Sequence, residues 1–134
     1  MIEVPSSAVN ASQFAKHVDF FSIGTNDLVQ YALAIDRVND EVNYLYDPFN
    51  SAVLQLIHNV IKAGKKYNIP VSLCGEMAGD INFTRLLLGM GLESFSMHPS
   101  AIPEIKKIIL NSDTNKFHSI VTVSYTHLTL PTIA

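Results

Sequence analysis

The sequence predicts an α/β protein in which parallel strands alternate with helices. Short apolar runs near residues 1–4, 20–24, 71–74 and 95–97 have the continuous hydrophobic character of strands buried on both faces. Amphipathic segments separate these runs, and each connection is long enough for a crossover. With 134 residues, the chain can form one domain, whereas a complete (β/α)8 barrel needs about 250. We therefore expect either a small open parallel sheet or a slice of a larger barrel.

The first third of the chain contains two expected strands. The run at residues 1–5 is strand-like and begins at the first residue, which suggests a truncated domain. Residues 8–17 are expected to form a helix because Val9, Phe14 and Val18 are spaced to share one apolar face. Residues 18–23 are expected to form a buried strand that ends at Gly24, followed by a loop and short helix at residues 26–35.

The middle of the chain contains the clearest helix. Residues 36–50 are polar and rich in turn-forming residues. Residues 51–67 then place apolar side chains at helical spacing, with Ser51 as the expected N-cap and lysines near the C-terminal end. The expected buried face consists of Val53, Leu54, Ile57, Val60 and Ile61.

The remaining elements repeat the strand–helix alternation. A strand at residues 71–74 should end at Gly75, and a helix at residues 81–90 should end at Gly91. A short strand at residues 95–97 and a last helix at residues 100–110 follow, with Pro103 tolerated because it lies in the first turn.

Composition and charge exclude several classes of protein. Hydrophobic residues make up 48% and charged residues 16%, which excludes a disordered tail and a coiled coil. The net charge of −3 argues against a nucleic-acid-binding or polybasic membrane-binding surface. The apolar runs are too short to span a bilayer, and the N-terminus lacks the pattern of a signal peptide. A single Cys suits a reducing compartment, so we expect a cytoplasmic protein without membrane insertion.

Chemically useful side chains follow three of the expected strands. Reactive groups gather at the carboxyl ends of strands in α/β folds, and those positions hold Glu3, Asn26, Asp27 and Cys74. Two carboxylates beside an amide suit Mg²⁺, which takes one or two protein oxygens together with substrate phosphate and water. The thiol could serve as a nucleophile or an acid, and Arg37 could bind a phosphate or carboxylate.

Structural interpretations of the same residues remain open. A carboxylate at a strand end is often a helix cap or a solvated group, and a single Cys that ends an apolar strand is often an inert core residue. Arg37 could form only a surface ion pair with Asp36, and residues 25–27 could simply cap the next helix. The histidines show no metal-ligand spacing and are interpreted as surface or packing residues: His17, His58, His98, His118 and His127.

Several motifs in order resemble one family of enzymes. Residues 1–5, 19–28, 34–37 and 74–80 look like the C-terminal part of enzyme I of the bacterial sugar phosphotransferase system, and the likeness continues to residue 110. Enzyme I is a phosphoenolpyruvate–protein phosphotransferase. Pyruvate phosphate dikinase and phosphoenolpyruvate synthase share the barrel and related motifs, but the amino-acid sequence of residues 22–24 and 31–37 is closer to that of enzyme I.

The resemblance implies the C-terminal portion of a (β/α)8 TIM barrel that binds phosphoenolpyruvate (PEP). It implies that Glu3 and Asp27 hold Mg²⁺, that Asn26, Asp27 and Arg37 form the substrate site, and that Cys74 donates a proton to the enolate carbon. It also implies a homodimeric parent enzyme that passes the phosphoryl group to the phosphocarrier protein HPr. The family's acceptor His and several phosphate-binding Arg residues lie upstream, so we expect the chain alone to be inactive.

The end of the chain departs from this resemblance. We expect residues 1–111 to be the partial barrel and residues 112–134 to be an atypical tail, because residues 121–134 are Ser/Thr-rich with strand-like alternation. The tail resembles read-through sequence of a truncated gene and is expected to pack poorly or to pair non-natively; a genuine C-terminal strand is the alternative. For the chain as a whole, the alternatives are a fragment of the dikinase or synthase, or a non-catalytic interaction module.

Overall fold

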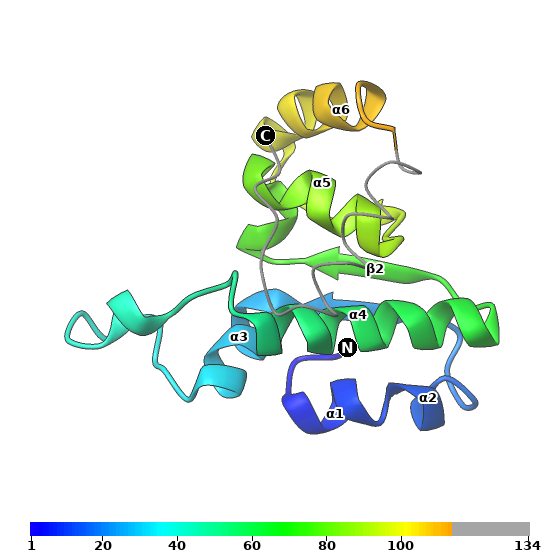
Figure 1. Ribbon diagram of the computed structural model, residues 1–134, viewed down its shortest axis with the longest axis horizontal. Helices are drawn as coiled ribbons and strands as arrows, with labels where there is room; N and C mark the ends of the chain where they lie inside the picture. Colours follow the sequence, from blue (N-terminus) through cyan, green and yellow to red (C-terminus); the bar gives the residue numbers. More distant parts are fainter. Residues whose placement is uncertain (114–134) are drawn as a thin grey trace.

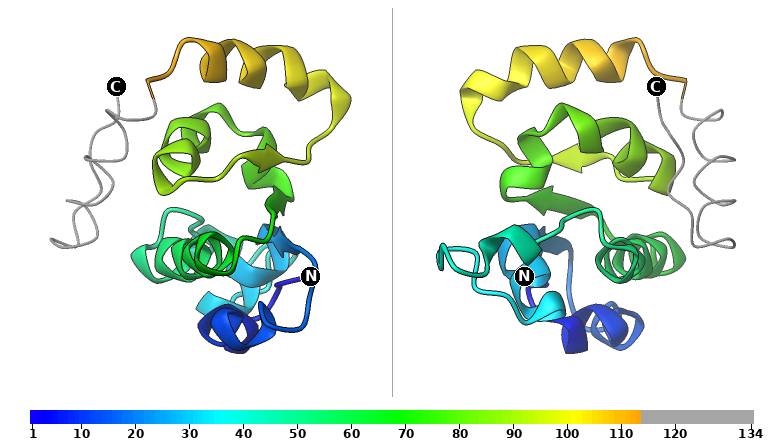
Figure 2. Two further views of the ribbon diagram at one scale, coloured as in Figure 1. Left: turned by 90° about the vertical axis from the view of Figure 1, so that its right-hand side faces the viewer. Right: turned by 60° about the vertical axis from the view of Figure 1, so that its left-hand side comes forward.

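A computed structural model describes residues 1–113 of the chain. The helices and strands are α1 (Pro5–Val9), α2 (Ala11–Phe14), β1 (Phe21–Gly24), α3 (Thr25–Leu33), α4 (Ser51–Tyr67), β2 (Val71–Cys74), α5 (Ile81–Met90), β3 (Ser94–Phe95) and α6 (Ile102–Leu110). Short 3-10 helices are η1 (Asn43–Leu45), η2 (Glu76–Gly79) and η3 (Pro99–Ala101). The long helix α4 has α1 and α2 on one side and β2 and α5 on the other (Figure 1). The elements stack from α1 and α2 at one end of the molecule to α6 at the other (Figure 2).

The strands form a parallel sheet in the order β1-β2-β3, which confirms the predicted parallel arrangement. Gly24 is paired with Cys74, so β1 and β2 end side by side. Ile2 extends the sheet beyond β1 through a parallel bridge to Ile23, with the Ile2 nitrogen 2.7 Å from the Ser22 oxygen. The predicted first strand is reduced to this bridge because α1 begins at Pro5. The described residues form an open α/β sheet.

The predicted helix at residues 8–17 is wrong in both bounds and buried face. Two short helices, α1 and α2, replace it, and the backbone breaks between them at Asn10. Val9 and Phe14, which were expected to face the core, are 66% and 46% exposed. The buried positions are alanines, namely Ala8, Ala11 and Ala15. Both helices contact α4, and small side chains allow this close approach.

Helix α4 has the predicted bounds and buries all five predicted apolar side chains. Its N-cap is Asn50 and not Ser51, since the Asn50 Oδ1 accepts a hydrogen bond from the Ala52 nitrogen at 2.9 Å. The helix ends at Asn68, which adopts a left-handed conformation with φ of 55°. Asn68 leads into Pro70 and then into β2.

The C-terminal third follows the prediction with shifted bounds. Helix α5 spans the predicted residues and ends at Gly91, whose φ of 92° favours glycine. Strand β3 lies at residues 94–95 and not 95–97, and α6 begins two residues later than expected, after η3. Pro103 lies in the first turn of α6 as predicted. The expectations for the tail from residue 114 onward lie outside the described residues.

The buried core lies between the sheet and the helices. Its largest fully buried side chains come from β1, β2, α3, α4 and α5, with Leu92 after α5. Within residues 1–113, no helix combines the length and apolar character needed to cross a membrane.

Candidate functional site

The carboxyl ends of β1 and β2 form one edge of the sheet, and we call this edge, with the residues that directly follow it, the carboxyl edge (Gly24–Asp27 and Cys74–Glu76). Glu3 lies against this edge. A Cβ atom at Gly24 would come within 2.6 Å of the Glu3 Cγ and 2.9 Å of its Oε1. Gly24 therefore leaves the space that the Glu3 side chain occupies. The structure brings Glu3 to the end of the strand pair, as the sequence predicts.

Two hydrogen bonds join the β1 and β2 ends of this edge. The Thr25 hydroxyl, on a residue that is 1% exposed, donates to the Cys74 carbonyl oxygen at 2.8 Å. The Glu76 backbone nitrogen donates to the Asn26 Oδ1 at 2.9 Å. Because its Oδ1 is held in this way, the Asn26 amide keeps both Nδ2 protons for other partners. The Asn26 Nδ2 group can therefore donate hydrogen bonds to a ligand at the carboxyl edge.

Gly75 lies between these two hydrogen bonds. Its φ of 96° falls in the region that favours glycine. A Cβ atom there would approach the Thr25 Oγ1 to 2.5 Å and the Asn26 Oδ1 to 2.8 Å. The structure therefore needs glycine at this position both for its backbone conformation and for the close approach of the two loops.

The interpretation of residues 25–27 as a simple helix cap does not fit the structure. Gly24 is the N-cap of α3, and no side chain caps the helix. The Thr25 and Asn26 side chains instead reach across to the loop after β2. Asp27 lies in the first turn of α3, where the helix dipole favours a negative charge.

Arg37 pairs with Asp27 and not with the adjacent Asp36. The Arg37 Nη2 lies 3.9 Å from the Asp27 Oδ1, and both side chains are about one-third to two-fifths exposed. The Asp36 Oδ1 accepts from the Val38 nitrogen, while the Gln30 Oε1 accepts from the Arg37 nitrogen. A pair this exposed contributes little stability, but it brings a guanidinium next to a carboxylate at the carboxyl edge.

Cys74 is half-buried at the end of β2. Its Sγ lies 3.5 Å from the Ile23 carbonyl oxygen, to which the thiol donates, and 3.8 Å from the Ser22 hydroxyl. Cys74 also lines a cavity of about 550 Å³ that Asn26 and Glu76 share. The arrangement therefore gathers a Cys, an Asn and a Glu around one open space.

Sequence reasoning missed two residues near this space. His98, which was interpreted as a surface or packing residue, lines the same cavity as Cys74, and its Nδ1 lies 2.8 Å from the Ser100 Oγ. Tyr46 donates its hydroxyl proton to the Asn26 carbonyl oxygen at 3.0 Å. Burial raises the pKa of Tyr46 above its ordinary value; among its charged neighbours, Arg37 opposes this shift and Glu76 and Asp27 add to it. No sequence signal distinguished Tyr46 within its turn-rich segment.

Residues 1–113 contain no group of three or more His, Cys, Asp or Glu side chains placed to hold a metal ion. Glu3 and Asp27 nevertheless fit the donor chemistry of Mg²⁺. Glu3 lies against Gly24, Asp27 lies in the first turn of the helix that follows Gly24, and Mg²⁺ commonly takes one or two protein carboxylates and completes its shell with substrate and water. Metal binding by this pair stays a prediction.

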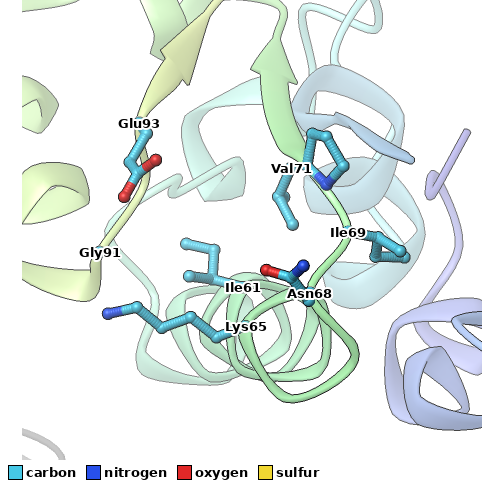
Figure 3. Close-up of a pocket in the computed structure, with 9 residues that line it drawn as sticks. Ile61, Lys65, Asn68, Ile69, Val71, Gly91 and Glu93 are labelled. Atoms are coloured by element: carbon cyan, nitrogen blue, oxygen red, sulfur yellow. The ribbon is translucent and has the colours of Figure 1, made fainter. Parts of the chain in front are cut away.

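A second pocket, of about 320 Å³, lies at the opposite end of the strands (Figure 3). Its apolar wall includes Ile61 and Val71, and Lys65 and Glu93 lie on different sides of it. The Lys65 ammonium lies close to Gly91, where α5 ends. A cation at a helix C-terminus is stabilised by the helix dipole, so Lys65 has a structural role here.

Comparison with known proteins assigns the family. The model of the family described as "PEP-utilising enzyme, PEP-binding domain" matches residues 1–114. The chain belongs to this family. The matched range contains Glu3, Asn26, Asp27, Arg37 and Cys74, which are the candidate site residues.

Three curated relatives of the chain carry the same name. Proteins named phosphoenolpyruvate-protein phosphotransferase are 50% identical over 121 residues in Latilactobacillus sakei, 53% over 116 residues in Streptococcus equinus and 48% over 121 residues in Cupriavidus necator. These matches cover 87–90% of this chain. The chain spans about a fifth of the length of these relatives (20–21%). The resemblance to enzyme I that the motifs indicated is confirmed.

Proposed function

We propose that this chain forms the C-terminal part of the PEP site of a phosphoenolpyruvate–protein phosphotransferase. Such an enzyme transfers the phosphoryl group of PEP to one of its own histidines and then to HPr in sugar uptake. The observation that supports the proposal is the carboxyl edge, where Glu3 lies against Gly24, Asn26 and Cys74 line one cavity, and Asp27 pairs with Arg37. In this proposal, residues 1–111 are the last part of a (β/α)8 barrel and residues 112–134 lie outside the family's pattern.

The proposed site divides into groups with different charges. Arg37 binds the phosphate oxygens of PEP as a cationic fork, and the Asn26 Nδ2 donates to the substrate while its Oδ1 is held by Glu76. Glu3 and Asp27 would hold Mg²⁺, which, when bound, supplies positive charge to the phosphate and the enolate oxygen. The Asp27 carboxylate thus has two candidate partners, the metal and Arg37.

Cys74 acts as the acid that completes pyruvate formation in this proposal. Cleavage of the bond between phosphorus and the enol oxygen leaves its electron pair on the enolate. The enolate C3 then takes the proton of the Cys74 thiol, which gives pyruvate and a thiolate that solvent reprotonates. The neutral thiol carries the proton that this step needs.

The remaining parts of the reaction belong to the longer enzyme in this proposal. The acceptor histidine and the surface that binds HPr lie in its N-terminal part, the enzyme is cytoplasmic, and the barrel domain forms a homodimer. We expect the 134-residue chain alone to transfer no phosphate, because phosphoryl transfer depends on positioning and charge stabilisation by the complete site.

A chimeric enzyme tests this function. In the Latilactobacillus sakei relative, the segment that aligns with this chain is replaced by the chain's own residues, and we call the product the chimera. We expect PEP-dependent phosphorylation of HPr by the chimera and none by the chain alone. Within the chimera, Asp27→Ala should abolish the activity, whereas Asp36→Ala, which removes a nearby exposed carboxylate, should retain it. A folded chimera without phosphotransfer would contradict the proposal.

A further inference from the structure

Tyr46 connects the segment between α3 and α4 to the carboxyl edge. Its hydroxyl donates to the Asn26 carbonyl oxygen at 3.0 Å, across 20 residues of sequence. The segment that carries Tyr46 is anchored nearby, since the rings of Phe49 and Phe83 stack with their centroids 3.9 Å apart. Tyr46 is half-buried and packs against the hydrophobic core. The hydroxyl is therefore held in place by packing and is not a freely moving surface group.

The bond acts on the backbone between two candidate site side chains. The Asn26 carbonyl belongs to the peptide unit that joins Asn26 to Asp27. A carbonyl oxygen has two lone pairs, so Tyr46 can bond it without replacing the helical hydrogen bond of α3. The Asn26 side chain is fixed separately through its Oδ1 by the Glu76 nitrogen. The Tyr46 bond adds a second, independent restraint, and this one also bears on Asp27.

We propose that Tyr46 is a positioning residue that fixes the Asn26–Asp27 peptide unit and thereby orients the amide and the carboxylate of the PEP site together. This inference rests on the proposed function of the carboxyl edge. Rotation of that peptide unit would displace both side chains at once. Small displacements of positioning groups are costly in phosphoryl transfer because the reaction depends on alignment.

The first test measures the contact in the 134-residue chain. Tyr46→Phe removes the hydroxyl and keeps the ring, and Tyr44→Phe is the matched control because Tyr44 lies in the same turn region and is 77% exposed. The Asp27 amide nitrogen is bonded to the Asn26 carbonyl carbon, so its ¹⁵N chemical shift reports on that carbonyl's hydrogen bonds. We expect the ¹⁵N chemical shift of the Asp27 amide to change in Tyr46→Phe and to remain unchanged in Tyr44→Phe. Equal spectra around Asp27 would overturn the contact.

The second test measures the effect on the site in the chimera. We expect Tyr46→Phe to raise the KM for PEP about tenfold, with a melting temperature close to that of the unsubstituted chimera, and Tyr44→Phe to change neither. An Asn26→Ala chimera keeps the backbone carbonyl and Asp27 but lacks the amide. If Tyr46 acts through the Asn26–Asp27 unit, Tyr46→Phe should still raise the KM of that chimera, but by clearly less than tenfold, because only the effect through Asp27 remains. A lower melting temperature with an unchanged KM would show a purely structural role and overturn the inference.

The two proposals fail in different ways. A folded chimera that carries the native Tyr46 and lacks phosphotransfer refutes the proposed function and, with it, this inference. An active chimera whose KM for PEP is indifferent to Tyr46→Phe refutes the positioning role alone. A full, independent tenfold effect of Tyr46→Phe on top of Asn26→Ala also refutes it, because the two residues would then act separately.

Discussion

The carboxyl edge and the pocket of Figure 3 lie at opposite ends of β2 and are built differently. At the carboxyl edge, side chains bond across loops, as Thr25 does to Cys74 and Asn26 to Glu76. At the opposite end, the pocket in Figure 3 has an apolar wall, and Lys65 lies near the C-terminus of a helix. The comparison shows that a pocket by itself does not indicate a functional site. The carboxyl edge differs because its polar groups are oriented and remain available to a ligand.

Glycine substitutions at the two ends should give the largest contrast. Gly75→Ala places a Cβ against Thr25 and Asn26 at a positive φ, so we expect phosphotransfer by the chimera to fall at least a hundredfold. Gly91→Ala has the same backbone strain, but its Cβ would approach closely only the flexible end of Lys65, with the Nζ at 3.0 Å, while the Ile61 Cγ2 stays at an ordinary 3.9 Å. We expect Gly91→Ala to lower stability by about 1 kcal/mol without loss of specific activity. Equal loss of activity in both variants would show that backbone strain alone matters.

Removal of the thiol should separate binding from chemistry. We expect Cys74→Ala in the chimera to bind PEP and Mg²⁺ normally and to form pyruvate about a hundredfold more slowly, because only the proton donor is lost. Titration calorimetry gives the affinity, and single-turnover kinetics gives the rate. Ser22→Ala, which removes the hydroxyl beside the thiol, is the control and should form pyruvate at a nearly normal rate. Unchanged pyruvate formation in Cys74→Ala would refute its assignment as the acid.

Loss of the buried Thr25 hydroxyl should have a moderate effect on stability. Thr25→Val keeps the shape and leaves the Cys74 carbonyl without this donor, so we expect a loss of about 1–2 kcal/mol in the free energy of unfolding. Thr84→Val is the matched control, since Thr84 is equally buried and its hydroxyl donates at 3.2 Å to the carbonyl of Asp80, the N-cap of α5. Both should destabilise the protein in urea unfolding, but only Thr25→Val should raise the KM for PEP.

The smallest effect is expected at the pocket of Figure 3. Lys65→Met keeps the aliphatic stem and removes the charge near the end of α5, which should lower stability by about 0.5 kcal/mol. The effect should shrink as salt is added, because exposed charges are screened. Phosphotransfer by the chimera should be unchanged. A clear loss of activity in Lys65→Met would show that this end of the sheet also takes part in function.

The sequence predicted β1, β2 and the two longest helices well, because burial determined the pattern there. Helices α4 and α5 have their predicted bounds because apolar periodicity and clear stop signals, such as Gly91, agree. The prediction of a helix at residues 8–17 failed because it was based on the spacing of the large apolar side chains. The side chains buried in this region are alanines, and α1 and α2 contact α4. Local pattern cannot show which face a neighbouring helix will cover.

The positions of several candidate site residues could be predicted from the fold and the motifs, whereas the hydrogen bonds that hold these residues could not. Glu3, Asn26 and Cys74 lie at the carboxyl edge as expected because parallel strands in register end together. Tyr46 and Thr25 act through hydrogen bonds between residues 20 and 49 positions apart. Such bonds depend on tertiary structure and leave no periodic signal in the sequence.

The most direct test of the carboxyl edge as a PEP site is calorimetric titration of PEP into the chimera with Mg²⁺ present. We measure the unsubstituted chimera, Asp27→Ala and the control Asp36→Ala, whose carboxylate accepts a backbone hydrogen bond at an exposed position. The account predicts that Asp27→Ala weakens PEP binding at least tenfold and removes its dependence on Mg²⁺, while Asp36→Ala binds normally. Equal PEP affinity and equal Mg²⁺ dependence in all three proteins would contradict it.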